Sequence, residues 1–173
     1  MKWRMTTDHH TDTDLTDCII AYIEGWLTLW RNNSGSYSEF MVRYYEYLLE
    51  HGEVMSPDMD KTRELLDGQY REPQVKSCYH NSLLMRFVNG ETLDLYEGFM
   101  IRADLMLPIE HGWNRDSNGK AIDFTATIWE RGDCQTILFG CQVPDEFAMK
   151  MMGETSVSGP YLFKYANRES ANV

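Results

Sequence analysis

The sequence has few cysteines, few basic residues and no long apolar run. Four cysteines stand far apart among 173 residues and form no CxxC pair, so neither a disulfide scaffold nor a zinc ribbon is supported. No apolar stretch approaches the roughly 20 residues that span a bilayer. The N-terminus turns polar and acidic where a signal peptide needs an apolar segment. We therefore expect a cytoplasmic protein without a membrane partner.

Basic residues are outnumbered by acidic ones, 16 to 27, which gives a formal net charge of -11. Nucleic-acid binders gain much of their affinity by placing Lys and Arg against phosphates, so we expect no nucleic-acid partner. Apolar residues make up 43% of the chain and aromatic residues 13%. This composition is sufficient for a folded core, and the length favours a single domain over residues 1–173.

Three helices are predicted in the first part of the chain, residues 1–68. Apolar side chains recur at helical spacing over residues 14–33, where Asp and Thr are available as caps. The next stretch begins with Ser36, has Glu39 three residues on and ends at Gly52, which predicts a reciprocal capping box and a left-handed C-terminal residue. Residues 56–68 resemble a shorter helix with proline in its first turn.

The pattern changes after residue 68. The elements expected there are a short helix at 78–90, a strand at 92–105, a hairpin at 109–127, a strand at 135–143 and a brief helix at 145–152. Helices followed by an antiparallel sheet predict an α+β domain. We divide it into a helical part (1–68), a core (69–152) and a C-terminal tail (153–173).

Cys78 opens the predicted helix at 78–90, directly after the extended, proline-containing "YREPQVKS". A thiol at a helix N-terminus meets the positive end of the helix dipole and unpaired backbone N–H groups, and both favour the thiolate. A nucleophilic cysteine also needs a histidine to take its proton and an acid to orient that histidine. His111 and Asp123 follow in this order. The alternative is a buried thiol, a hydrogen-bonded strand histidine and a solvated acid.

The stretches "CYHNSLL", "YEG", "HGW" and "IDFT" resemble the core of the papain-like and transglutaminase-like cysteine enzymes, over residues 69–141. The resemblance implies that Cys78 is the nucleophile, His111 the general base and acid, and Asp123 the orienting acid. It also implies an oxyanion hole that uses the backbone N–H of Cys78 and a side-chain donor upstream. Gln74 is the first candidate for this donor and Gln69 the second.

Three further residues of the core match the pattern of these enzymes. Tyr79 takes the place of the bulky aromatic residue that often follows the nucleophile. Asn81 and Glu97 also stand at positions of the pattern, and we expect structural roles for both.

The resemblance implies a cysteine-dependent hydrolase or acyltransferase that needs no metal or cofactor. It would act on an amide bond of a protein or peptide-like substrate, through an acyl-thioester on Cys78. Such scaffolds also host inactive relatives. The second hypothesis is therefore a non-catalytic protein-binding effector, phage-encoded or host-directed, that uses an acidic, aromatic-rich surface.

The turn of the hairpin decides whether the three residues can meet. A two-residue turn at Asn118-Gly119 would place Asp123 and His111 on opposite faces. A three-residue loop over 117–119, with Gly119 left-handed, pairs Asp116 with Lys120 and places the acid diagonal to the histidine. The apolar pattern favours the first register. We predict the second, because a sheet covered on both sides can bury apolar residues on either face, whereas the acid must point at the histidine.

Other histidines offer weaker candidates. His9 and His10, with Asp12 and Asp14, could be taken for a metal cluster, but a flexible polar terminus explains them better. His80 stands two residues from Cys78 and so projects elsewhere on a helix.

Overall fold

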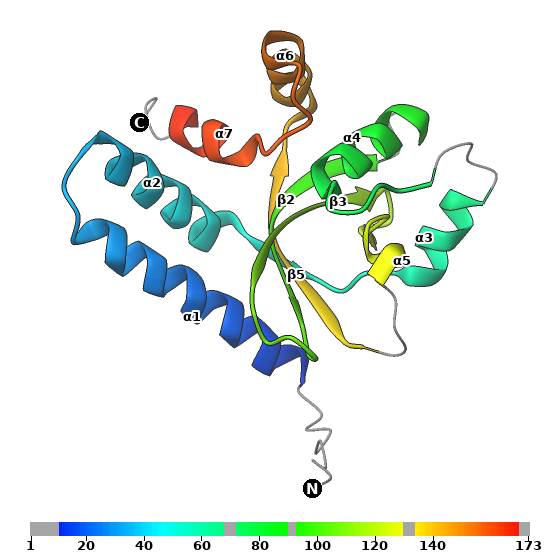
Figure 1. The fold of residues 1–173 in the computed structure, drawn as a ribbon, viewed down its shortest axis with the longest axis horizontal. Coiled ribbons are helices and arrows are strands. Elements are labelled where there is room, and N and C mark those ends of the chain that lie inside the picture. The colour runs from blue at the N-terminus through cyan, green and yellow to red at the C-terminus, as the bar shows by residue number, and fades with distance from the viewer. Residues whose placement is uncertain (1–10, 68–71, 90–92, 130–133, 170–173) are drawn as a thin grey trace, which may run out of the picture.

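The computed structural model describes residues 11–67, 72–89, 93–129 and 134–169, and within them it is a mixed α+β structure (Figure 1). The helices are α1 (Asp12–Arg31), α2 (Ser36–His51), α3 (Met59–Leu66), α4 (Cys78–Asn89), α5 (Ala126–Trp129), α6 (Asp145–Thr155) and α7 (Leu162–Glu169). The strands are β1 (Glu53–Met55), β2 (Leu93–Arg102), β3 (Ile109–Asp116), β4 (Ala121–Ile122) and β5 (Thr136–Val143). The expected α+β class is confirmed.

The five strands form one antiparallel sheet in the order β1-β5-β2-β3-β4. The long strand β2 lies in the middle, between β5 and β3. Alternate residues of β2 point to opposite faces. Leu95 and Phe99 belong to one buried cluster, while Tyr96 and Met100 belong to another. Apolar residues are therefore buried on both faces of the sheet.

The larger cluster lies on the face covered by α1, α2 and α7 (Figure 1). Helix α1 contributes four fully or nearly buried residues at helical spacing: Leu15, Ile19, Ile23 and Leu27. Its N-terminus carries a reciprocal capping box, in which the hydroxyl of Thr11 accepts from the N–H of Asp14 and the Asp14 carboxylate accepts from the N–H of Thr11. The predicted first helix thus has both a core face and a defined start.

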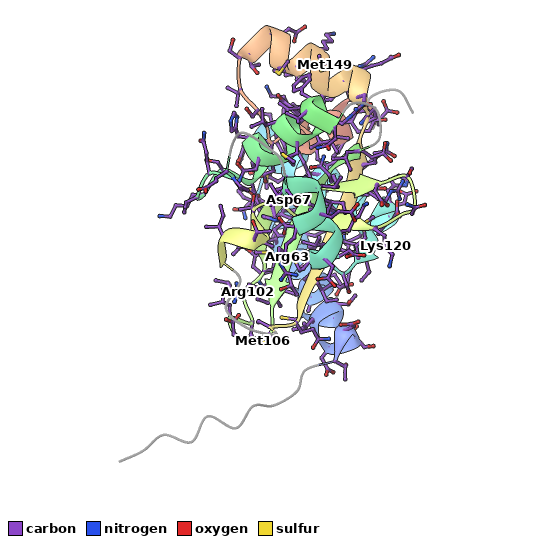
Figure 2. The ribbon with its side chains drawn as sticks, turned by 90° about the vertical axis from the view of Figure 1, so that its right-hand side faces the viewer. Arg63, Asp67, Arg102, Met106, Lys120 and Met149 are labelled. Atoms are coloured by element: carbon purple, nitrogen blue, oxygen red, sulfur yellow. The ribbon has the colours of Figure 1, made fainter. Side chains whose placement is uncertain are left out.

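A smaller cluster joins α3 and α4 to the hairpin. Met85 of α4 packs with Leu93 of β2 and with Ile122 and Phe124, and two leucines of α3 pack against this group. Helix α3 faces the viewer in Figure 2, where Arg63 and Asp67 are labelled. This cluster holds the end of the hairpin against both helices.

Two predictions about the ends of α2 are wrong. Ser36 is already the first helical residue, so its hydroxyl does not cap the helix; Gly35 is the N-cap instead, with a φ of 130° that glycine tolerates. Gly52 is extended rather than left-handed, because the chain passes directly from α2 into β1. A Cβ at Gly52 would lie 2.3 Å from Cζ of Phe139. Glycine is therefore required at position 52 because the Phe139 ring packs directly against the backbone there.

The predicted C-terminal tail at 153–173 contains a helix. Helix α7 packs against α2, and Asn167 donates a 3.2 Å hydrogen bond to the carbonyl oxygen of Phe40. The eight-residue helix has a strongly amphipathic pattern, but its partner lies more than 100 residues away in the sequence. Strand β1 was missed for a similar reason, since its three residues become a strand only beside β5.

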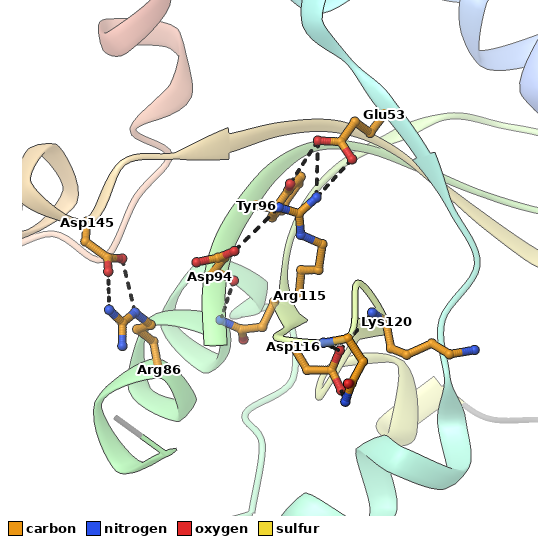
Figure 3. A network of polar contacts seen from close by, with 10 residues as sticks. Glu53, Arg86, Asp94, Tyr96, Arg115, Asp116, Lys120 and Asp145 are labelled. Carbon is orange, nitrogen blue, oxygen red and sulfur yellow. Dashed lines mark hydrogen bonds and ion pairs between the residues drawn. The ribbon is translucent and has the colours of Figure 1, made fainter. Parts of the chain in front are cut away.

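A polar network joins three strands on the face of the sheet that carries Tyr96 (Figure 3). The guanidinium of Arg115 lies 4.7 Å from the ring centre of Tyr96, and its Nη1 lies 2.9 Å from Oε2 of Glu53. The hydroxyl of Tyr96 donates to Glu53, while Asp94 lies 3.5 Å from the other end of the guanidinium. One arginine on β3 thus links β1 and β2.

The described part of the chain contains no helix that is long and apolar enough to cross a membrane. In Figure 2, Met149 of α6 and Met106, which follows β2, lie at opposite ends of the described residues. Both methionines are exposed.

The packing around Gly52 predicts a specific loss of stability. Gly52→Ala should lower the free energy of unfolding by about 2 kcal/mol, because the new methyl group meets Phe139 and the Leu48 carbonyl. Gly25→Ala is the matched control at an exposed position of α1, where nothing lies within 4 Å of the added Cβ. It should stabilise by roughly 0.5–1 kcal/mol. Urea unfolding of both variants measures the difference, and equal stability of Gly52→Ala and the parent would contradict the packing argument.

Candidate active site

Cys78 is the first residue of α4, as the sequence predicts, and its side chain is half-buried. The helix packs along β2 and β3, so its N-terminus reaches the edge of β3. Strand β4 pairs only with Asn114 and Arg115, so the ladder stops before Gly112. The backbone N–H of Gly112 therefore donates to the Cys78 sulfur, together with the N–H of Tyr79. The Cys78 sulfur therefore lies between the first turn of α4 and the edge of β3 that extends beyond β4.

The hairpin adopts the predicted register. Asn114 pairs with Ile122, the N–H of Asp116 donates to the carbonyl oxygen of Lys120 at 2.9 Å, and Gly119 has a φ of 81°. These contacts define a three-residue loop over 117–119. The predicted strand does not continue to residue 125, however, because β4 ends at Ile122 and the chain then turns.

Asp116 explains why the loop has three residues. Its Oδ1 accepts the backbone N–H groups of Asn118 and Lys120, each at 2.9 Å (Figure 3). Burial raises the pKa of Asp116, but these N–H groups and the Asn118 side chain outweigh it and lower the pKa below its usual value. The aspartate directly before the loop is a sequence signal for it.

His111 and Asp123 meet in a fully buried hydrogen bond. The distance between His111 Nε2 and Asp123 Oδ2 is 2.8 Å, and neither side chain is exposed to solvent. Trp113 lies next to the histidine on β3, with its ring nearly parallel at a centroid distance of 6.4 Å. The predicted register therefore brings the His111 and Asp123 side chains into contact.

Asp123 is held in place by backbone groups on both sides. Its Oδ1 accepts the N–H groups of Thr125 and Ala126, each at 3.0 Å, and its own N–H donates to Oγ1 of Thr62 at 3.3 Å. Thr62 lies on α3 and is completely buried. One carboxylate oxygen is thus fixed by the turn, which leaves the other for His111. Sequence reasoning missed Thr62, because nothing local to α3 signals this contact.

His111 lowers the pKa of Cys78 and Cys78 raises the pKa of His111, so the thiol and the imidazole lie close enough to interact. Nε2 binds Asp123, so Nδ1 is the ring nitrogen that would accept the proton of the thiol. His80 has a different partner, because its Nδ1 lies 3.1 Å from Oγ of Ser158. The structure therefore brings Cys78, His111 and Asp123 together in the predicted order.

The electrostatics favour a thiolate beside an imidazolium. Burial raises the pKa of Cys78, but the hydrogen bond and charge of His111 and the two backbone N–H groups lower it below the ordinary value. Burial lowers the pKa of His111, but the charge and hydrogen bond of Asp123 raise it well above the ordinary value. Both shifts favour the charged pair of thiolate and imidazolium over the neutral pair.

Asn81 ties the segment before the nucleophile to the segment after the acid. Its Oδ1 accepts the N–H of Gln74 at 2.8 Å, and its Nδ2 donates to the carbonyl oxygen of Gln74 and to Oγ1 of Thr125, each at 2.9 Å. Asn81 is buried, in agreement with the structural role expected for it.

The proposed side-chain donor Gln74 has a fixed backbone and an exposed side chain. The contacts with Asn81 fix where the Gln74 backbone lies relative to α4. Gln69, His9 and His10 lie outside the described residues. Asp14 of the possible metal cluster belongs to the capping box of α1, and no group of three or more His, Cys, Asp or Glu residues in the described ranges is arranged to hold a metal.

The pKa shifts predict that Cys78 is the most reactive thiol. Iodoacetamide at about pH 6.5 should label it at least tenfold faster than Cys141, whose burial raises its pKa to about 12. The Cys78 rate should fall by at least about tenfold in His111→Ala, which removes the charged partner. Mass spectrometry of peptides gives each rate. Equal labelling of all four cysteines would refute the activated thiol.

The loop of the hairpin predicts a second effect on the same thiol. Asp116→Ala removes two hydrogen bonds to the loop and should destabilise the protein by about 1–3 kcal/mol. It should also slow Cys78 labelling, because the register presents Asp123 to His111. Asp104→Ala, which removes an exposed partner of Arg102, is the control and should cost at most about 1 kcal/mol. An unchanged Cys78 rate in folded Asp116→Ala would show that the loop does not support the site.

Comparisons of the chain with protein-family models, with curated proteins and with solved structures find no match. The papain-like and transglutaminase-like resemblance accordingly stays a prediction from the motifs.

Proposed function

We propose that this protein is a cysteine-dependent hydrolase or acyltransferase that acts on an amide bond of a protein or peptide-like substrate. The observation that supports this best is the single imidazole that binds the buried Asp123 carboxylate at 2.8 Å and lowers the pKa of the Cys78 thiol. A buried acid with no chemical task would be costly to retain, because removal of a carboxylate from water is unfavourable. In a site with a nucleophile and a base, the task of Asp123 would be to orient the base.

The reaction follows from the charges of the resting pair. The Cys78 thiolate attacks the carbonyl carbon of the amide and forms a tetrahedral oxyanion. His111, as the imidazolium, donates its proton to the leaving nitrogen, so the carbon–nitrogen bond breaks and an amine departs. The acyl group remains on Cys78 as a thioester. His111 then accepts a proton from the attacking water or amine, and the acid or new amide leaves with Cys78 restored.

Two donors are proposed for the oxyanion. The backbone N–H of Cys78 belongs to the first turn of α4, where N–H groups lack helical partners. Gln74 is the proposed side-chain donor, and Asn81 holds its backbone in place. Donors fixed before the substrate binds stabilise the developing charge most effectively.

Trapping of the acyl-enzyme tests the proposal without a known substrate. p-Nitrophenyl acetate should acetylate Cys78 and release nitrophenol in a burst that matches the enzyme concentration. Cys78→Ala should lose the burst, whereas Cys134→Ala, which removes another half-buried thiol, should keep it. A library of fluorogenic peptide amides then tests amide cleavage, with and without added amines as acceptors.

The same experiments distinguish the alternative of a non-catalytic binding protein. Full activity of Cys78→Ala on any cleaved amide would overturn the proposed nucleophile. No acetyl adduct on Cys78, together with uniform labelling of the cysteines, would favour a protein that uses the fold for binding alone. That alternative predicts instead that a protein partner is bound equally well by the parent and by Cys78→Ala.

A further inference from the structure

The segment between α6 and α7, residues 156–161, lies against the first turn of the nucleophile helix. We call this segment the strap. Oγ of Ser158 lies 3.1 Å from Nδ1 of His80. A Cβ placed on Gly159 would lie 3.0 Å from Cβ of Tyr79, so the backbone of the strap touches the residue that follows Cys78.

Glu97 joins the strap to the sheet. Its Oε2 accepts the N–H groups of Tyr161 and Leu162 at 2.6 and 2.7 Å, where α7 begins. Oε1 lies against Gly159, at 2.9 Å from a Cβ built there, and has no hydrogen-bond partner among the described residues. The residue is 1% exposed. A buried carboxylate with one oxygen unpartnered is unfavourable unless its position serves another purpose.

The purpose follows from the neighbours of Glu97. On the sheet, Glu97 stands opposite Gly112, whose N–H donates to the Cys78 sulfur. Through the strap it contacts Tyr79, whose N–H donates to the same sulfur. A Cβ on Gly112 would lie 2.7 Å from the Tyr79 ring, so these parts are closely packed. The carboxylate thus supports the side of the thiol opposite to His111 and Asp123.

We propose that Glu97 is a positioning residue for Cys78: its carboxylate fixes the strap against Tyr79 and so keeps the N–H of Tyr79 directed at the sulfur. The inference rests on the proposed function, since it concerns activation of the same thiol. The negative charge matters because the two N–H groups at the start of α7 bind a carboxylate more strongly than a neutral acceptor.

The ionisation of Glu97 makes the support depend on pH. Burial raises its pKa to about 7, against the lowering effect of the Leu162 and Tyr161 N–H groups. The titratable groups that face it come from each packed element: Tyr44 of α2, Tyr79 of α4, Glu110 of β3, Cys141 of β5 and Tyr161 of the strap. As pH rises through about 7, Glu97 gains its charge and the strap tightens. The rate of Cys78 labelling should then rise more steeply with pH than ionisation of the thiol alone would make it rise.

The test compares iodoacetamide labelling of Cys78 in the parent and in Glu97→Gln between about pH 5.5 and pH 8. The parent should react about fivefold faster at the upper end, and the two rates should converge at the lower end, where the parent Glu97 is also neutral. A loss of packing alone would slow the variant by the same factor at every pH. Asp14→Asn, which also neutralises a carboxylate at a helix N-terminus but lies on α1, should match the parent throughout.

Three outcomes are distinguishable. Fast Cys78 labelling with identical profiles for the parent and Glu97→Gln would overturn the role of Glu97 and leave the proposed nucleophile intact. Slow Cys78 labelling in the parent would instead overturn the proposed function. If Glu97→Gln fails to fold, Gly159→Ala supplies the second variant, because its methyl group pushes the strap from Tyr79 and Glu97 without a change of charge. It should slow Cys78 above about pH 7, and an unchanged rate would refute the proposal.

Discussion

The candidate site depends on the carboxylate of Asp116, which accepts two backbone N–H groups of the β3–β4 loop at 2.9 Å. These bonds favour a loop of three residues over one of two. A change of one residue in register moves every side chain of the second strand to the other face. The loop therefore decides that Asp123 faces His111. A contact at the surface end of the hairpin determines the composition of a buried site near its other end.

The buried carboxylate of Asp123 is stabilised by hydrogen-bond donors at both of its oxygens. Asp123 has two N–H donors on one oxygen and the imidazole on the other. The imidazole of His111 is itself held by this carboxylate and lies near the Cys78 thiol. Both carboxylate oxygens thus replace the water that they lose on burial, which is the condition under which charged groups are tolerated inside a protein.

The scaffold contributes parts that lie far from the site in the sequence. Thr62 of α3 supports Asp123, Asn81 joins the two segments that flank the site, and Glu97 connects the strap to the sheet. The short strand β4 has an equally important effect, since its early end leaves the Gly112 N–H for the sulfur. The surroundings of one thiol accordingly depend on the whole α+β arrangement.

The sequence alone determined the α+β class and the start of α4 at Cys78, and the requirement that an acid face the histidine selected one of two possible hairpin registers. These features depend on local periodicity, a local turn and the chemistry that a nucleophile requires. The tertiary structure decided the rest. Gly52 is extended because β1 follows it, α7 is stable because α2 covers it, and the Gly112 N–H reaches the thiol because β4 is short. Such contacts join residues distant in the chain, and local patterns carry no information about them.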